Sequence, residues 1–162
     1  MACRGVHFAL TAEEEALLVD ELHDDDELRE ILAGIEQRWD RQWLQETDKA
    51  WDAIHRCLTD GSLSYGKTPL HRCILGCDNL LYEGDDYIIN YLPADEVREV
   101  AEAIEGIDES WMRRRYFALP VDHAVPLSEA DFEYTWGWFV RLRAFFQRAV
   151  ACGRAVVFTA DQ

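Results

Sequence analysis

The sequence predicts an α+β fold, in which one small mixed or antiparallel sheet of four or five strands packs with several helices in a single domain, 1–162. Three observations support this class. A β-type segment lies near each end of the chain, at Cys3–Leu10 and Ala155–Phe158. Two more such segments flank a turn in the middle of the chain. The stretches between them repeat apolar residues at helical spacing and carry helix caps, so we expect helices to cover the sheet.

The first strand and the first helix follow from alternation and from a capping motif. Apolar residues alternate along Cys3–Leu10, which is typical of a strand. Thr11 and Glu14 then form a Thr-x-x-Glu capping box, and the apolar residues after it predict a helix that ends near His23.

A second helix is predicted to begin at the acidic run Asp24–Glu27, where negative charge suits the positive end of the helix dipole. The apolar residues that follow repeat at helical spacing; they are Leu28, Ile31, Leu32, Ile35 and Trp39. The next segment, Arg38–Glu46, is ambiguous between a continued helix and a loop because no cap separates it from the next element.

The segment Thr47–Gly61 predicts a third helix with clear ends. Asp48 is expected to open this helix, and Asp60 with Gly61 to provide a polar exit and a left-handed C-cap. One face of the helix carries a histidine among apolar side chains; its members are Trp51, Ile54, His55 and Leu58.

The second half of the chain predicts a hairpin and three helices. Leu80–Glu83 and Tyr87–Leu92 are expected to pair across the Gly84–Asp86 turn. The helices are expected to follow Pro93 as far as Glu105, to run over Asp108–Tyr116, and to extend from a Ser128 cap to Gly153.

Composition describes an acidic globular protein. Apolar residues make up 49% and aromatic residues 12%, which excludes general disorder. The net charge of −16, from 16 basic and 32 acidic residues, makes nucleic acid a poor ligand. Residues 1–50 and 51–110 each carry −9, whereas residues 111–162 carry +2. The sequence contains neither a long apolar run nor a secretion signal, so we expect no membrane association and a cytoplasmic location.

Five segments carry a resemblance to a known family. In chain order they are Thr47–Gly61, Leu92–Val97, Phe132–Trp136, Leu142–Phe146 and Gly153–Gln162. Together they resemble the YfbM-like bacterial family of unknown function, domain-of-unknown-function family 1877, with Asp48–His55 (DKAWDAIH) as the most specific part. The resemblance implies a compact single-domain α+β fold and a bacterial cytoplasmic origin. It implies no established activity.

The sharpest candidate site centres on His55. Trp51 lies one turn before it, and Asp52 is close enough along the helix to reach an imidazole nitrogen and raise its pKa. With Asp48 and Tyr134, these residues form a candidate pocket for acid–base chemistry or ligand binding. The alternative is a core histidine that donates to a backbone carbonyl, and this interpretation is favoured because no nucleophile or second base lies nearby in sequence.

The cysteines give no firm site. Cys57, His71, Cys73 and Cys77 have ligand chemistry for zinc, but they lack the paired C-x2-C spacing of zinc sites. The five cysteines are odd in number and scattered, which favours free thiols, and Cys3 or Cys152 as a nucleophile would need a neighbouring base. We therefore expect no metal and no other cofactor. The common nucleotide-binding, serine-hydrolase and zinc-protease motifs are also missing.

Acidic residues of the first two predicted helices form a candidate interaction face; they are Glu13, Glu14, Asp24, Asp25, Asp26 and Glu27. Such a face is usually only solvated, but it also complements a basic protein, as an immunity protein complements a toxin. The leading hypothesis is therefore a non-enzymatic protein-binding domain of immunity or antitoxin type. The alternative is a small enzyme or ligand-binding protein with its pocket around Trp51 and His55.

Overall fold

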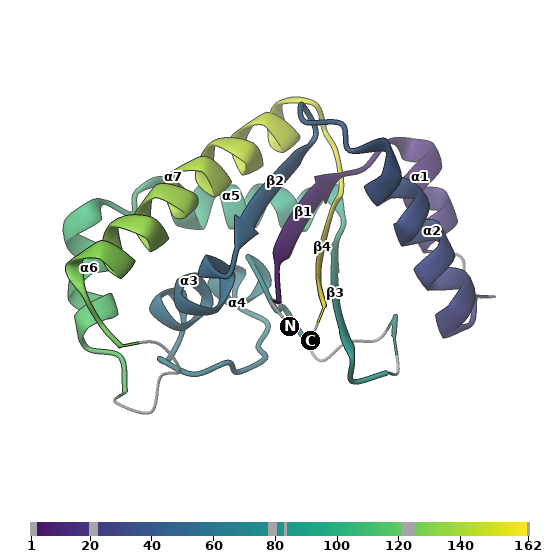
Figure 1. Ribbon diagram of the computed structural model, residues 1–162. Helices are drawn as coiled ribbons and strands as arrows, with labels where there is room; N and C mark the ends of the chain where they lie inside the picture. The colour runs from purple at the N-terminus through teal and green to yellow at the C-terminus, as the bar shows by residue number, and fades with distance from the viewer. Residues whose placement is uncertain (1–2, 20–22, 78–80, 83, 121–125, 162) are drawn as a thin grey trace.

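One antiparallel sheet lies at the centre of the molecule (Figure 1). The computed structural model describes residues 3–19, 23–77, 81–82, 84–120 and 126–161. The strands are β1 (Gly5–Ala9), β2 (Leu44–Asp48), β3 (Tyr87–Leu92) and β4 (Val156–Asp161). Their order is β2-β1-β4-β3, and each neighbouring pair is antiparallel. The first and last strands therefore pair in the middle of the sheet.

Helices cover both faces of this sheet, as Figure 1 shows. On one side lie α1 (Ala12–Leu18) and α2 (Asp25–Arg38). On the other side lie α3 (Ala50–Leu58), α4 (Pro69–Arg72), α5 (Ala94–Glu105), α6 (Glu109–Phe117) and α7 (Glu129–Ala151). No helix in the described part of the chain is both long enough and apolar enough to cross a membrane.

Two hydrophobic cores follow from this three-layer arrangement. On β1, Val6 and Phe8 pack with α1 and α2, whereas Ala9 packs into the larger core beneath α7. His7 points to the same side as Ala9, and its ring lies 4.7 Å from the ring of Phe158. Because apolar side chains are buried on both faces, β4 is buried from Val156 to Ala160 without alternation.

The α+β class and most helix boundaries predicted from sequence are confirmed. The Thr11 hydroxyl accepts from the Glu14 amide, and the Glu14 carboxylate accepts from the Thr11 amide, which completes the capping box. Ser128 caps α7, and Gly106 ends α5. Gly61 adopts a left-handed φ of 91° after α3, where its N–H donates to the carbonyl of Arg56.

Three predictions around β2 are wrong. Trp39 does not extend α2 but ends it in a left-handed conformation. Strand β2 begins at Leu44 inside the segment Arg38–Glu46, which was expected to be helix or loop, and continues to Asp48. Asp48 is the last residue of that strand, so it does not open α3. Helix α3 begins at Ala50, and the side chain of Lys49 at the N-cap position makes no capping hydrogen bond. The tryptophans of this segment fit a helical spacing by coincidence, while tertiary pairing with β1 decides its conformation.

The predicted central hairpin is also wrong. β3 pairs with β4, and Leu81 and Tyr82 are not in a strand; Leu80 and Glu83 lie outside the described residues. The first helix ends at Leu18 rather than near His23, and residues 20–22 are likewise outside the description. Local turn chemistry suggested a partner for β3 that the long-range pairing with the C-terminal strand replaces.

Two polar side chains from the sheet hold the segment after α4. Asn90 Nδ2 on β3 donates to the carbonyls of Arg72 and Ile74, each at 2.8 Å. His7 Nε2 on β1 lies 2.8 Å from the carbonyl of Cys73. Three successive carbonyls thus find donors although the segment lies in the core, where an unpaired carbonyl is costly.

Gly5 is required where β1 passes between β2 and the larger core. A Cβ there would lie 2.7 Å from Phe158, 2.8 Å from Trp51 and 2.9 Å from Thr47. We expect Gly5→Ala to lower the free energy of unfolding by about 1–3 kcal/mol, because these buried neighbours must move. In the control Gly137→Ala, the added Cβ meets no other part of the described chain within 4 Å outside its own helix backbone. The change also removes a helix-interior glycine, so it should be neutral or stabilising in the same denaturant titration. Equal effects of the two substitutions would contradict the packing argument.

Candidate functional site

The structure places His55 and Trp51 of the predicted pocket in the core. His55 is fully buried, and its Nε2 lies 2.7 Å from the Ser64 carbonyl. Since a carbonyl only accepts, Nε2 carries the proton, and Nδ1 has no hydrogen-bond partner among the described residues. Trp51 is 5% exposed and donates from Nε1 to the Cys3 carbonyl at 3.2 Å. This is the geometry of a histidine that fastens a loop to a helix.

The pKa of His55 moves opposite to the direction predicted from sequence. Burial lowers the pKa from 6.5 to about 4, and the hydrogen bond to Ser64 opposes this only in part. The nearby charge of Asp52 acts to raise the pKa, as predicted, but it is a smaller effect. Asp52 also accepts from Arg56 Nε at 2.7 Å. His55 is therefore neutral at physiological pH.

Asp48 and Tyr134 contact each other at the surface, and not beside His55 in the core. The Tyr134 hydroxyl on α7 donates to Asp48 Oδ2 at 2.7 Å, and Arg4 Nε lies 3.4 Å from Asp48 Oδ1. Partial burial, together with this bond, raises the pKa of Tyr134 to about 12. Asp48 holds a left-handed φ of 46° at the end of β2. The pair joins the edge strand to the longest helix.

The candidate zinc ligands also separate into different roles. Cys57 and Cys73 are buried in the larger core, and burial raises the pKa of the Cys57 thiol to about 12. His71 Nδ1 lies 2.7 Å from the Thr68 hydroxyl, and the Cys77 thiol faces the Gly66 carbonyl. Within the described ranges, no three His, Cys, Asp or Glu side chains are grouped to hold a metal ion.

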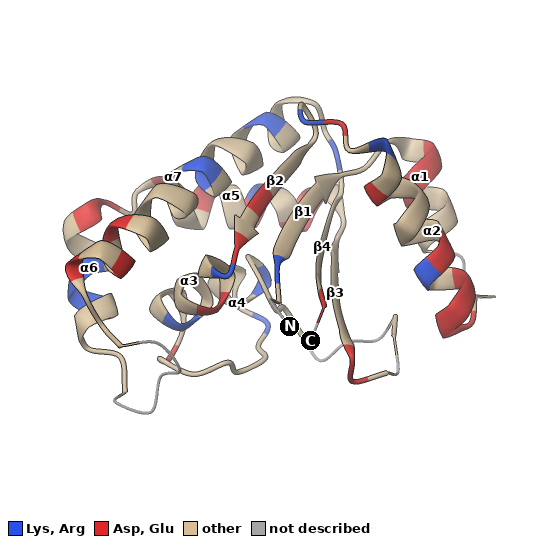
Figure 2. Cartoon of the chain, viewed as in Figure 1, with Lys and Arg blue, Asp and Glu red and all other residues tan. Residues whose placement is uncertain are grey.

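The predicted acidic face lies on the solvent side of α1 and α2 (Figure 2), but several of its carboxylates cap a helix or bond to a neighbouring residue. Glu14 completes the capping box and pairs with Arg38. Asp24 caps α2, and Asp25 accepts from the Gly84 amide at 3.2 Å. Glu27 lies 3.3 Å from a ring nitrogen of His23. These bonds fix where the four carboxylates lie.

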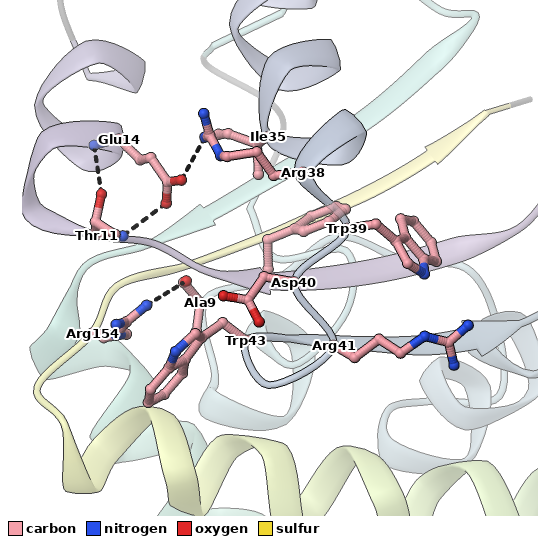
Figure 3. A pocket seen from close by; sticks show the side chains of 11 residues that line it. Ala9, Thr11, Glu14, Ile35, Arg38, Trp39, Asp40, Arg41, Trp43 and Arg154 are labelled. Atoms are coloured by element: carbon pink, nitrogen blue, oxygen red, sulfur yellow. Dashed lines mark hydrogen bonds and ion pairs between the residues drawn. The ribbon is translucent and has the colours of Figure 1, made fainter.

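A cleft that the sequence analysis did not predict opens at one end of the sheet (Figure 3). It has a volume of about 650 Å³, within the range of small-molecule sites. The end of β1, the start of α1, the end of α2, the loop before β2 and the turn before β4 enclose it. Its charged and aromatic lining consists of Phe8, Glu14, Arg38, Trp39, Asp40, Arg41, Trp43 and Arg154.

Arg154 is held on one wall of the cleft by Trp43. Its guanidinium carbon lies 3.6 Å from the centroid of the indole, and its Nη1 donates to the Ala9 carbonyl at 3.4 Å. Trp43 is fixed in turn by backbone bonds, because its carbonyl accepts from the Ala9 amide and its amide donates to the Asp40 carbonyl. The arginine is therefore oriented, while most of its N–H groups remain available.

Trp39 lines the cleft in a strained backbone conformation. Its φ and ψ are 39° and 48°, in the left-handed region that bulky residues rarely occupy. Its indole packs edge-on against Phe8, with centroids 6.3 Å apart, and remains 36% exposed. Strained residues that the surrounding fold over-determines concentrate at binding sites.

Sequence reasoning missed this cleft for a physical reason. Trp39, Asp40, Arg41 and Trp43 lie together in the segment whose conformation was ambiguous, and Arg154 is more than a hundred residues away. The one local signal of a binding site was the sequence WDRQW at residues 39–43, in which two tryptophans and two charged residues follow a predicted helix. Only the pairing of β1 with both β2 and β4 brings the two parts together.

Comparison with known families agrees with the fold. A family model described as "Domain of unknown function (DUF1877)" matches residues 1–159. The chain belongs to the DUF1877 family. The resemblance seen in the sequence is thereby confirmed, and the family carries no assigned activity.

Among solved structures, this DUF1877 protein is similar to the crystal structure of YfbM, a protein of unknown function from Escherichia coli. The two sequences are 20% identical, and the match covers 97% of this chain and 99% of that chain with a TM-score of 0.71. At this level of identity the similarity shows a shared fold. No curated protein matches the sequence.

Proposed function

We propose that this DUF1877 protein is a non-enzymatic, cytoplasmic protein-binding domain that takes a basic protein on the solvent side of α1 and α2. The observation that carries the proposal is the charge of this layer. The two helices together contain eight acidic and two basic residues. Figure 2 shows acidic segments on both helices. Such a field attracts a cationic partner and speeds its encounter.

Free carboxylates and exposed apolar side chains adjoin one another on this layer. Glu13, Asp26 and Glu30 are exposed and have no ion-pair partner among the described residues. On α1 and at its end, Leu17 and Val19 are 56% and 40% exposed. Charges that orient a partner beside apolar side chains that lose water on contact are the usual composition of a protein interface.

The most concrete form of the proposal is an immunity or antitoxin role. A toxin that acts on nucleic acid or phosphate has a basic active site, and an acidic domain neutralises it by covering that site. If the protein has this role, we also expect a gene for a basic toxin beside its own gene. It requires no catalytic residue in this chain.

Charge reversal on the layer tests the proposal. We expect a variant combining Glu13→Lys, Asp26→Lys and Glu30→Lys to lose a basic partner that the wild-type protein retains in a pull-down from bacterial lysate at low salt. The control reverses three exposed carboxylates, Glu102 and Glu105 on α5 and Glu109 at the start of α6. The control has the same net charge as the test variant.

The two variants distinguish binding through a specific face from a general effect of net charge on binding. Loss of the partner in the first variant alone supports the acidic layer as the binding surface. Equal loss in both variants contradicts a defined face. If the wild-type protein retains no basic protein and no toxin-like gene lies beside its gene, the immunity role is contradicted.

A further inference from the structure

The cleft at the end of the sheet has a charge unlike that of the rest of the protein. Three arginines and two acids line it, in a chain with twice as many acidic as basic residues. One of these acids, Glu14, is already paired with Arg38. Arg41 is exposed and, among the described residues, has no ion-pair or hydrogen-bond partner. The cleft therefore concentrates available cationic groups, which cost energy to bring together.

Arg154 offers the chemistry of an oxyanion receptor. Trp43 stacks on one face of its guanidinium, and one N–H is used by the Ala9 carbonyl at 3.4 Å. The remaining N–H groups lie in the plane of the guanidinium, where a carboxylate or a phosphate binds through two oxygens. Because the stack fixes the plane beforehand, little side-chain entropy is lost on binding.

The remainder of the cleft accommodates a planar group. A cavity of about 650 Å³ is much larger than an inorganic anion needs. Trp39 is held at the wall in its strained conformation with its indole partly exposed. Figure 3 shows the Asp40 carboxylate between Trp43 and Trp39, with Arg41 extending on the side away from Arg154. A ligand reaching across the cleft meets an acceptor in Asp40 and an aromatic surface in Trp39.

We propose that this cleft binds a small organic anion whose carboxylate or phosphate lies on Arg154 and whose planar group extends toward Trp39 and Arg41. Asp40 accepts a hydrogen bond from an N–H or O–H of the same ligand. This inference is tested independently of the protein-binding proposal, because the residues changed in that test, Glu13, Asp26 and Glu30, do not line the cleft.

Titration of the full-length protein with two probes tests the site. Benzoate carries a carboxylate on a planar ring, and adenosine monophosphate carries a phosphate together with a planar base; calorimetry at low ionic strength measures the binding of each. We expect at least one probe to bind saturably with a dissociation constant of about 1 mM or lower. The indole N–H signals of Trp39 and Trp43, assigned with Trp39→Phe and Trp43→Phe, should shift on binding. The probe that binds identifies the oxyanion.

Three arginine variants locate the binding. Arg154→Gln is expected to weaken it roughly 10- to 100-fold, as loss of a charged hydrogen-bond donor does. Arg41→Gln removes an exposed side chain without a partner among the described residues and should weaken binding about 3- to 10-fold while leaving the fold intact. Arg141→Gln is the control, because its guanidinium stacks on Trp138 at 5.0 Å on α7, outside the cleft.

Each result decides the proposal. Weaker binding by the Arg154 and Arg41 variants with unchanged binding by the Arg141 variant supports the site. If the Arg154 variant fails to fold, the Arg41 variant decides alone. No saturable binding of either probe to the wild type overturns the proposal, as does binding that the Arg154 and Arg41 substitutions leave unchanged. Inorganic phosphate bound as tightly as adenosine monophosphate would overturn the role of the planar group.

Discussion

Acidification from pH 7 to pH 4 is expected to lower the free energy of unfolding by several kcal/mol through two buried histidines. Both His7 and His55 are fully buried, and burial lowers the pKa of each from 6.5 to about 4. The ring of His7 is surrounded by Phe145, Phe146 and Phe158, and among the described residues no charged group acts to stabilise an imidazolium there. Both rings are therefore held neutral in the folded protein.

The direction of the effect follows from which state binds the proton. Above about pH 6.5 neither the folded nor the unfolded chain protonates these histidines, so their contribution to stability is complete. Below that value the two histidines bind protons in the unfolded chain, whereas in the folded chain they remain neutral until about pH 4. A shift of this size corresponds to about 3 kcal/mol for each histidine.

Denaturant titrations at several pH values measure this contribution. The slope of unfolding free energy against pH, between pH 6.5 and 4, should fall in His7→Gln and again in His55→Gln. The slope is the informative quantity, since either substitution also changes stability at pH 7 by altering the core. Around His55, the nearby His71 acts to lower its pKa, whereas the charges of Asp52 and Asp60 act to raise it. A slope that neither substitution reduces would contradict the assignment.

Removal of the Asn90 amide is expected to destabilise the protein by about 2–5 kcal/mol. Asn90 is 8% exposed, and its Nδ2 donates to the carbonyls of both Arg72 and Ile74. Asn90→Ala leaves two buried carbonyls without a donor, each at about 1–3 kcal/mol. Amide exchange in the segment after α4 should also become faster, because the sheet no longer holds it.

Gln147→Ala is the matched control for Asn90. It also removes a side-chain amide that donates to a backbone carbonyl, that of Ala101, but at 3.4 Å and from an exposed position. We expect its effect to stay within about 0.5 kcal/mol. If Asn90→Ala were as mild as this control, the two carbonyls would have another partner and the anchoring role would be wrong.

Elements with both a cap and a sustained period were predictable from sequence. The capping box at Thr11 and the Ser128 cap of α7 mark their helices correctly, because they satisfy local amide groups that do not depend on the rest of the fold. Strand β2 was not predictable. Its sequence, Leu44–Asp48, contains one buried apolar residue and takes its conformation from pairing with β1.

The candidate pocket illustrates the same limit. Helical spacing correctly put His55 on a buried face with Trp51, but sequence does not reveal whether such a face meets a cavity or a core. The bond from His55 to Ser64 connects residues across the exit of α3, which no spacing rule anticipates. Asp48 and Tyr134 do meet, yet their meeting depends on how α7 crosses the edge strand.

His7 and Asn90 also determine which residues face one another across the strands. When both faces of a sheet are apolar, hydrophobic alternation no longer tells a strand which way its side chains should point. A slip of one residue would turn His7 into the core beneath α1 and α2, away from the Cys73 carbonyl, and the same slip would separate Asn90 from its two acceptors. These two polar side chains penalise a misaligned pairing of β1 or of β3 with β4. They therefore select a single alignment, which the surrounding apolar residues alone would not distinguish from its neighbours.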